Sequence, residues 1–143
     1  MTRYLLEVNV LVALIDPSHI QHEEAHAWLA RVGCKSFATC PITENGLLRV
    51  AGHPKPPNSP GLPSAVASAL KTLRELPGHK FWADSISLMN SEVVDTSLLS
   101  SHSRVSDSYL LALARANKGQ LATLDQKLAT EVVADGKSSL ALI

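Results

Sequence analysis

Short hydrophobic runs alternate with longer amphipathic stretches along the whole chain. Runs of this length, rich in branched or small apolar residues, are typical of strands that are buried on both faces of a sheet. The pattern predicts five such strands, at residues 3–8, 36–39, 80–83, 120–124 and 139–143.

The amphipathic stretches between these runs predict helices. The clearest helix covers residues 107–117, with Ser106 as its N-cap. Asn9 is the predicted N-cap of a short first helix, and Pro41 suits the first position of a helix that follows Cys40. Helices are also expected at residues 9–16, 19–32, 64–76 and 126–133, with a loop at 52–63 and no assignment for 84–94.

The alternation of strands and helices indicates an α/β fold, with a parallel sheet covered by helices on both faces. At 143 residues and 15.3 kDa, the chain is expected to form one domain, residues 1–143, with a core that needs no disulfide. Hydrophobic residues make up 45% of the chain and charged residues 18%, a balance that excludes intrinsic disorder.

Charge and cysteine content exclude further classes of protein. Thirteen Lys and Arg balance 13 Asp and Glu, which argues against a protein that coats nucleic acid through net positive charge. The longest apolar run, residues 10–15, is too short to cross a membrane, so no membrane partner is expected. Cys34 and Cys40 are expected to be reduced thiols in a cytoplasmic protein, although their spacing alone leaves a bridge between them open.

Four acids fall at predicted strand ends or helix starts, where ligands bind in open parallel sheets. They are Glu7, Glu44, Asp107 and Asp125. Taken singly, Glu44 and Asp107 suit a helix N-terminus, Asp125 suits a helix cap, and Glu7 suits a local charge pair. Taken together, clustered carboxylates require a cation, and Mg²⁺ or Mn²⁺ prefers oxygen ligands. Such an ion suits phosphodiester hydrolysis, because it polarises phosphate oxygens and lowers the pKa of water.

Three segments resemble the successive motifs of PIN-domain proteins, specifically VapC-type toxins of bacterial toxin–antitoxin pairs. They are RYLLEVNVLVALID, CPITENGLLRV and RVSDSYLLALARANKGQLATLD, and the resemblance spans nearly the whole chain. It implies a PIN-like three-layer α/β/α domain with a five-stranded parallel sheet. It also implies a Mg²⁺- or Mn²⁺-dependent endoribonuclease that forms a homodimer and is held inactive by a cognate VapB-type antitoxin.

Carried over by position, the acidic site of the family falls on the same four acids, Glu7, Glu44, Asp107 and Asp125. Asn9, Ser106 and Thr123 match polar positions that support this site in the family, although a strand residue is the simpler interpretation of Thr123. Arg49 and Arg104 lie within one or two helical turns of site acids and are candidate contacts for RNA phosphates.

The first acid departs from the family pattern, which has Asp where this chain has Glu7. The extra methylene moves the carboxylate by about 1.5 Å, whereas a catalytic arrangement tolerates about 0.5 Å. We therefore expect weaker or altered metal binding, and either a relaxed natural site or a disabled toxin.

Two other kinds of function compete with this interpretation. One is a catalytically inactive PIN-like module that binds antitoxin or RNA, and the other is a signalling domain with a phospho-acceptor aspartate. A zinc site at His19, His22 and His26 is also conceivable, but the sequence offers no fourth ligand with suitable spacing, so a solvated helix surface is the better interpretation.

Overall fold

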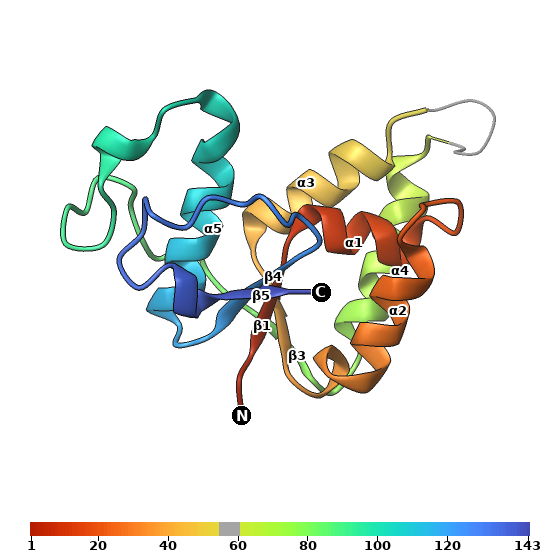
Figure 1. Cartoon of the computed structure of the whole chain (residues 1–143). Helices are drawn as coiled ribbons and strands as arrows, with labels where there is room; N and C mark the ends of the chain where they lie inside the picture. Colours follow the sequence, from red (N-terminus) through yellow and green to blue (C-terminus); the bar gives the residue numbers. More distant parts are fainter. Residues whose placement is uncertain (55–60) are drawn as a thin grey trace.

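The structure, a computed structural model, describes residues 1–54 and 61–143, and its centre is a parallel sheet (Figure 1). The sheet has five strands in the order β3-β2-β1-β4-β5, and every neighbouring pair is parallel. All five predicted strands are confirmed, with somewhat shorter bounds: β1 Tyr4–Leu6, β2 Phe37–Thr39, β3 His79–Phe81, β4 Gln120–Thr123 and β5 Leu140–Leu142.

In the part of the chain that the structure describes, five α-helices lie between β1 and β4. They are α1 Val8–Ile15, α2 His22–Arg31, α3 Pro41–Ala51, α4 Pro63–Arg74 and α5 Val105–Ala116. Pro41 occupies the first position of α3, as predicted. Two predicted caps are wrong, because Glu7 precedes α1 and Arg104 precedes α5, so that Asn9 and Ser106 lie inside the first turns of these helices. The predicted loop 52–63 lies partly outside the described residues.

Helices cover both faces of the sheet, as Figure 1 shows with α5 on one side and α1, α2 and α4 on the other. Side chains alternate along each strand and therefore divide the core into two clusters. Leu5, Ala38 and Leu121 pack in the cluster with α5. Leu6, Phe37 and Ala122 pack in the cluster with α1, α2 and α4. This gives the three layers that the resemblance implies.

The predicted helix at residues 126–133 is wrong. This segment consists of turns and extended chain, and the backbone at its end pairs with the segment before α5. Val133 forms an isolated antiparallel bridge with Val94, and the Val132 carbonyl accepts a hydrogen bond from the Asp95 amide at 2.8 Å. Buried Leu128, Val132 and Val133 then complete the core beside α5.

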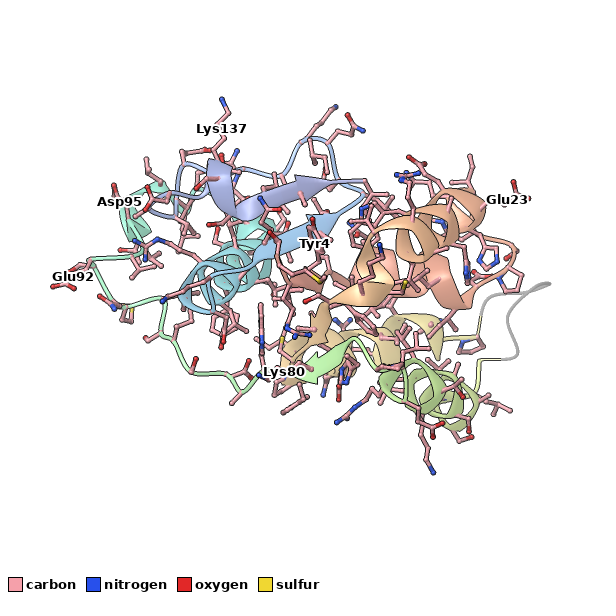
Figure 2. The ribbon with its side chains drawn as sticks, turned by 90° about the horizontal axis from the view of Figure 1, so that it is seen from below. Tyr4, Glu23, Lys80, Glu92, Asp95 and Lys137 are labelled. Atoms are coloured by element: carbon pink, nitrogen blue, oxygen red, sulfur yellow. The ribbon has the colours of Figure 1, made fainter. Side chains whose placement is uncertain are left out.

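The segment between β3 and α5 lies at the end of the molecule remote from α2. In Figure 2 its residues Glu92 and Asp95 are at one end, Glu23 of α2 is at the other, and Lys80 in β3 marks one edge of the sheet. Three short 3₁₀ helices of the described residues lie on this side of the structure: η2 Thr96–Leu98, η3 His102–Arg104 and η4 Lys137–Ser139. A further one, η1 Gly33–Lys35, follows α2. No helix among the described residues is long and apolar enough to span a bilayer.

Candidate functional site

Glu7 is buried where β1 passes into α1, and Thr123 at the end of β4 binds its carboxylate. The Thr123 hydroxyl donates to Glu7 Oε2 and accepts from the Asn9 side-chain amide at 3.1 Å. It also accepts from the Asp125 backbone amide at 3.0 Å, and Asn9 Oδ1 accepts from the Leu124 amide at 3.3 Å. Asn9 and Thr123 therefore join the ends of two adjacent strands around one carboxylate, as supporting residues of an acidic site would.

Asp107 and Asp125 surround Glu7 with further negative charge. The pKa of Glu7 is raised from 4.5 to about 7; burial is the largest cause, interactions with Asp107 and Asp125 add to it, and the Thr123 hydrogen bond opposes it. Burial also raises the pKa of Asp107, and the charge of Asp125 adds to this effect. A hydrogen bond joins the carboxyl groups of Glu7 and Asp107, which stabilises the protonated form of Glu7 and the ionised form of Asp107. Glu7 and Asp107 thus share a proton, and the charge of Asp125 acts on both.

The charge-pair alternative for Glu7 fails, because the ion pairs between described residues involve none of these three acids. The cap alternative for Asp125 also fails, because no helix follows it. Its Oδ1 accepts from the Lys127 amide at 2.9 Å in a tight turn, and its side chain is exposed. Asp107 lies in the first turn of α5.

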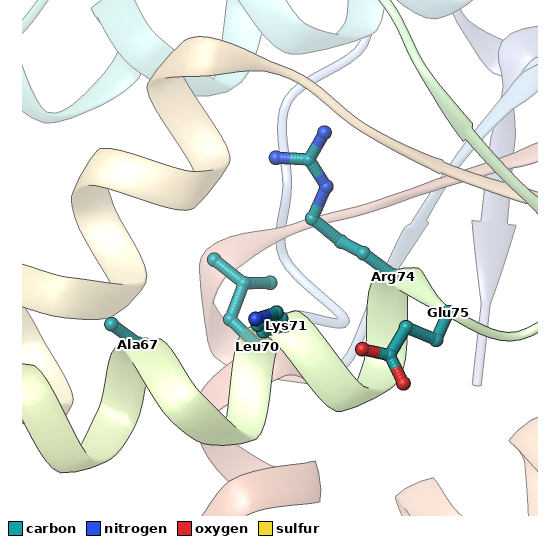
Figure 3. A pocket seen from close by; sticks show the side chains of 5 residues that line it. All are labelled: Ala67, Leu70, Lys71, Arg74 and Glu75. Atoms are coloured by element: carbon teal, nitrogen blue, oxygen red, sulfur yellow. The ribbon is translucent and has the colours of Figure 1, made fainter.

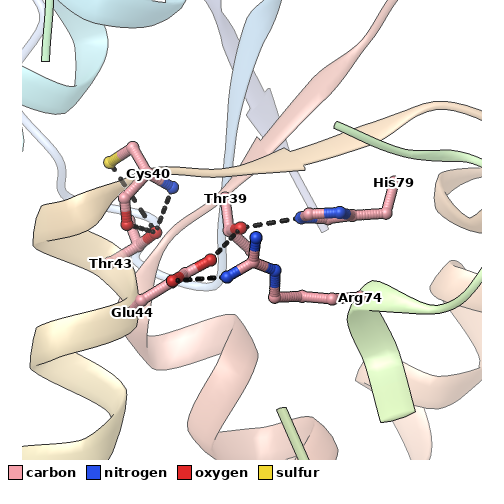
Figure 4. A network of polar contacts seen from close by, with 6 residues as sticks. All are labelled: Thr39, Cys40, Thr43, Glu44, Arg74 and His79. Atoms are coloured by element: carbon pink, nitrogen blue, oxygen red, sulfur yellow. Dashed lines mark hydrogen bonds and ion pairs between the residues drawn. The ribbon is translucent and has the colours of Figure 1, made fainter. Parts of the chain in front are cut away.

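Glu44 lies in the first turn of α3, as predicted, but its carboxylate binds other partners (Figure 4). Thr39 donates to Glu44 Oε2 at 2.6 Å, and Arg74 of α4 donates to Oε1 at 3.1 Å. The Thr39 hydroxyl also contacts His79 Nε2 at 2.8 Å. Glu44 is not among the charges that raise the pKa of Glu7. The structure therefore brings three of the four predicted acids together and holds the fourth in a separate network.

The other predicted residues lie on exposed parts of the surface. Ser106 is exposed in the first turn of α5. Arg49 is exposed in the last turn of α3, and Arg104 forms an ion pair with Glu131 at 3.2 Å. Contacts of these two arginines with RNA stay predictions.

The histidine run has a structural role that the sequence did not suggest. His22 Nδ1 and His26 Nε2 each lie 2.7 Å from a backbone carbonyl oxygen, of Ala13 and Leu14, at the end of α1. Their rings pack edge to face with centroids 4.4 Å apart. They therefore stabilise the carbonyl end of α1, where unpaired backbone groups need donors. Cys34 and Cys40 are free thiols, as expected.

The carboxylates of Glu7, Asp107 and Asp125 are suitable ligands for a hard cation, but their side chains do not yet form a complete coordination site. Their donors are all oxygens. Burial and then repulsion between their charges raise the pKa of Glu7 and of Asp107, and a cation would relieve that repulsion. Within residues 1–54 and 61–143, however, no three His, Cys, Asp or Glu side chains are grouped as ligands of one ion. Metal binding at Glu7, Asp107 and Asp125 would therefore require the proton between the first two to leave and their side chains to adjust.

Sequence reasoning missed Thr39, Arg74 and His79, the partners of Glu44. One signal was available, because Thr39 ends a buried strand as Thr123 does, and a hydroxyl at such a position needs a polar partner. Arg74 offered no signal, since a basic residue in the last turn of a helix is ordinary.

Comparison with known proteins gives a consistent family assignment. The PIN domain family profile matches residues 4–131. Ribonuclease VapC44 of Mycobacterium tuberculosis is 42% identical over 134 residues, with 92% of both chains covered. Ribonuclease VapC39 of the same species is 37% identical over 125 residues, which cover 87% of this chain and 90% of the relative.

Two solved structures share the fold at low sequence identity. One is the Rickettsia felis VapBC2 complex bound to a DNA fragment from its promoter, with a TM-score of 0.57, 17% identity and coverage of 88% of this chain and 90% of that chain. The other is Mycobacterium tuberculosis VapC20, a toxin that cleaves the sarcin-ricin loop, with a TM-score of 0.59, 14% identity and coverage of 92% and 99%. These likenesses support the three-layer architecture.

Proposed function

Because this chain belongs to the PIN domain family, we propose that it is a Mg²⁺- or Mn²⁺-dependent endoribonuclease and the toxin of a toxin–antitoxin pair. The observation that carries the proposal is the meeting of Glu7, Asp107 and Asp125 at the carboxyl ends of β1 and β4 and the start of α5. Relatives at 37–42% identity that are named ribonucleases support the same activity.

In this proposal the three acids hold the cation through carboxylate oxygens. Thr123 orients Glu7 by its hydrogen bond, and Asn9 in turn holds the Thr123 hydroxyl. The bound ion would polarise the scissile phosphate and lower the pKa of an attacking water. Glu7 must lose the proton that it shares with Asp107 before both carboxylates can bind the ion.

The partners of this function are proposals as well. We propose that a VapB-type antitoxin covers the site, that the chain forms a homodimer, and that it acts on RNA in the cytoplasm. The VapBC2 complex among the structural neighbours supports an antitoxin partner. Arg49 and Arg104 are proposed phosphate contacts, and Arg104 would have to exchange Glu131 for the nucleic acid.

One observation favours a second candidate, a catalytically inactive module that binds antitoxin or RNA. The residue at position 7 is Glu where the family has Asp, and its carboxyl group is already bound by Thr123 and Asp107. In this candidate Glu7 keeps its proton and stays bound to Asp107, and the fold serves recognition alone.

The proposed function is tested by incubating purified chain, free of antitoxin, with total bacterial RNA and Mn²⁺. We expect endonucleolytic fragments that disappear with EDTA and fall at least 100-fold with Asp107→Asn, since one misplaced catalytic group costs about this factor. The matched control is Asp95→Asn, which changes an exposed acid at the N-cap of η2; this variant should cleave RNA normally. Undiminished cleavage by Asp107→Asn would refute the site.

Thermal unfolding with and without Mn²⁺ separates the two candidates. A nuclease with a competent site gains stability as Mn²⁺ exceeds its dissociation constant, by about 2.7 kcal/mol at a 100-fold excess. A binding module shows no such gain at any concentration and leaves RNA intact.

A further inference from the structure

The two ends of the sheet carry opposite charges, although the chain as a whole has a net charge of zero. The strands are parallel, so their first residues lie at one edge and their last residues at the other. Glu7 and Asp125 follow the carboxyl ends of β1 and β4. Arg3, Lys35 and Lys118 lie within two residues of the amino ends of β1, β2 and β4. The edge opposite to the acidic site is therefore basic.

A surface pocket of about 240 Å³, which we call the amino-edge pocket, lies beside the start of β1 and the end of α2. It is lined by Met1, Thr2, Tyr4, Arg31, Val32 and Lys35. Two cationic side chains and no Asp or Glu are among these described residues. Since one water takes about 30 Å³ of liquid volume, the pocket has room for a phosphate group and bound waters.

The two cations of this pocket, Arg31 and Lys35, have no acidic partner. Within residues 1–54 and 61–143, the ion pairs involve Arg74, Arg104 and Arg115 instead. Arg31 is the last residue of α2 and Lys35 the last of η1. The dipole of α2 accounts for one cation at most, since its carbonyl end is equivalent to about half a negative charge. Two exposed cations therefore leave positive charge that an anion would neutralise.

Tyr4 and the turn after α2 hold the amino-edge pocket in shape. The Tyr4 ring packs edge to face on Trp28 of α2, with centroids 5.3 Å apart and an interplanar angle of 81°. Gly33 lies against the same indole, because a Cβ there would be 2.5 Å from Trp28 Cζ3. These contacts fix the turn that separates Arg31 from Lys35. A preformed pocket loses less conformational entropy when it binds a ligand.

The pocket on α4 has a different character (Figure 3). Its volume is about 270 Å³, and it is lined by Ala67, Leu70, Lys71, Arg74 and Glu75. An anion there would meet the carboxylate of Glu75 and would compete for Arg74, which is paired with Glu44 at 3.1 Å. Lys71 is exposed and forms none of the ion pairs between described residues. It is therefore a matched control for the charge of Lys35.

We propose that the amino-edge pocket binds a phosphate group through Arg31 and Lys35, either of the RNA backbone or of a free phosphate. Tyr4 lies three residues before Glu7, about 10 Å along the strand, so one phosphate cannot reach both the pocket and the acidic site. RNA bound here would be held by a phosphate other than the scissile one, which fixes its position without reading its sequence. The RNA source rests on the proposed function, whereas the phosphate site does not.

The test titrates the full chain, in EDTA so that metal-dependent cleavage is suppressed, with inorganic phosphate and separately with a labelled uridine dodecamer RNA. Calorimetry measures the first binding and fluorescence anisotropy the second. We expect the double variant Arg31→Gln/Lys35→Gln to weaken both about tenfold, the scale of a lost hydrogen bond to a charged group. The slope of log K for the RNA against log salt should become shallower by about 1.

Two further variants show whether charge at this place is the cause. The double variant Arg31→Lys/Lys35→Arg keeps both charges and should bind phosphate and RNA within about threefold of the unaltered chain, because phosphate contacts depend chiefly on charge. Lys71→Gln removes one charge elsewhere and should also leave both affinities unchanged.

The two titrations identify the source of the phosphate. Weaker RNA binding by Arg31→Gln/Lys35→Gln assigns the pocket to the RNA backbone, and weaker binding of inorganic phosphate alone assigns it to a free phosphate. Unchanged affinities in both titrations would overturn the proposal, as would an equal loss with Lys71→Gln or an unaltered chain that binds neither probe. Neither titration requires cleavage, so a chain that leaves RNA intact in Mn²⁺ would refute the proposed function without deciding the fate of the pocket, which the phosphate titration decides.

Discussion

Thr39 and Thr123 end two strands of one parallel sheet at the same edge, but their hydroxyls point to opposite faces and each donates to a different acid. Thr123 binds Glu7 beside α5, and Thr39 binds Glu44 beneath α4. Whether a threonine occupies an odd or an even position in its strand thus determines which acid it can bind, because successive side chains point to opposite faces of the sheet. The acidic site therefore lies on the face of the sheet that α5 covers.

The Thr123 hydroxyl is predicted to be a principal support of the acidic site. Thr123→Val removes the donor to Glu7 and leaves the Asn9 and Asp125 N–H groups without their acceptor. We expect a loss of about 1–3 kcal/mol in the free energy of unfolding, together with weaker Mn²⁺ binding. Urea denaturation measures the first and calorimetry the second.

Thr72→Val, on the exposed face of α4, is the matched control and should change the free energy of unfolding by less than about 0.5 kcal/mol. Equal losses in the two variants would show that Thr123 contributes nothing specific to the site.

The acidic site should make the metal-free chain less stable as the pH rises. The pKa of Glu7 is raised from 4.5 to about 7 in the folded chain, so the folded state favours the protonated form. Its contribution to stability is therefore complete below pH 4.5 and lost as the pH rises to about 7, with an upper bound of about 3 kcal/mol. Urea denaturation in EDTA at pH 5 and pH 8 measures this change.

Glu7→Gln keeps the hydrogen-bonding shape without the charge, and it should be more stable than the unaltered chain at pH 8 and show a smaller loss between the two pH values. Glu23→Gln, on the exposed face of α2, should follow the unaltered chain. An identical pH dependence in Glu7→Gln would contradict the proton shared with Asp107.

Close packing of α3 on α1 should make Gly46 intolerant of a side chain. An added Cβ would meet Val8 Cγ2 at 2.7 Å, at the residue directly after Glu7. We expect Gly46→Ala to destabilise the chain by about 1–3 kcal/mol, although Ala is the better helix former by about 1 kcal/mol. Thermal unfolding measures the effect, and the loss should shrink in a Val8→Ala background. A rise in Tm would show that helix propensity outweighs the contact.

Much of the fold follows from periodicity. All five strands and the five α-helices were predicted within a few residues, because short buried runs and amphipathic stretches are distinct signals. The failure at residues 126–133 has a specific cause. Leu128, Val132 and Val133 have helical spacing, yet the backbone of Val132 and Val133 pairs with Asp95 and Val94, roughly 40 residues earlier in the chain. Pairing between segments so far apart in the chain leaves no signal in the local sequence pattern.

The site was predictable in part for the same reason. Glu7, Asp107 and Asp125 follow from strand ends and the first turn of α5, which are features of local sequence. The place of Glu44 depends on which face of β2 Thr39 occupies and on Arg74, thirty residues further along the chain. Side-chain partners of this kind are decided by packing, so the sequence pattern did not show that Glu44 binds Thr39 and Arg74.

The most direct test of the account is the rate of Mn²⁺-dependent RNA cleavage by Glu7→Asp beside the unaltered chain, without antitoxin. Aspartate shortens the side chain by one methylene, which withdraws the carboxylate from Asp107 and restores the acid that the family has at this position. The account predicts cleavage about 10–100 times faster for Glu7→Asp, as expected for a misplacement of about 1 Å, and loss of that cleavage when Asp107→Asn is added. An equal or slower rate for Glu7→Asp would contradict it.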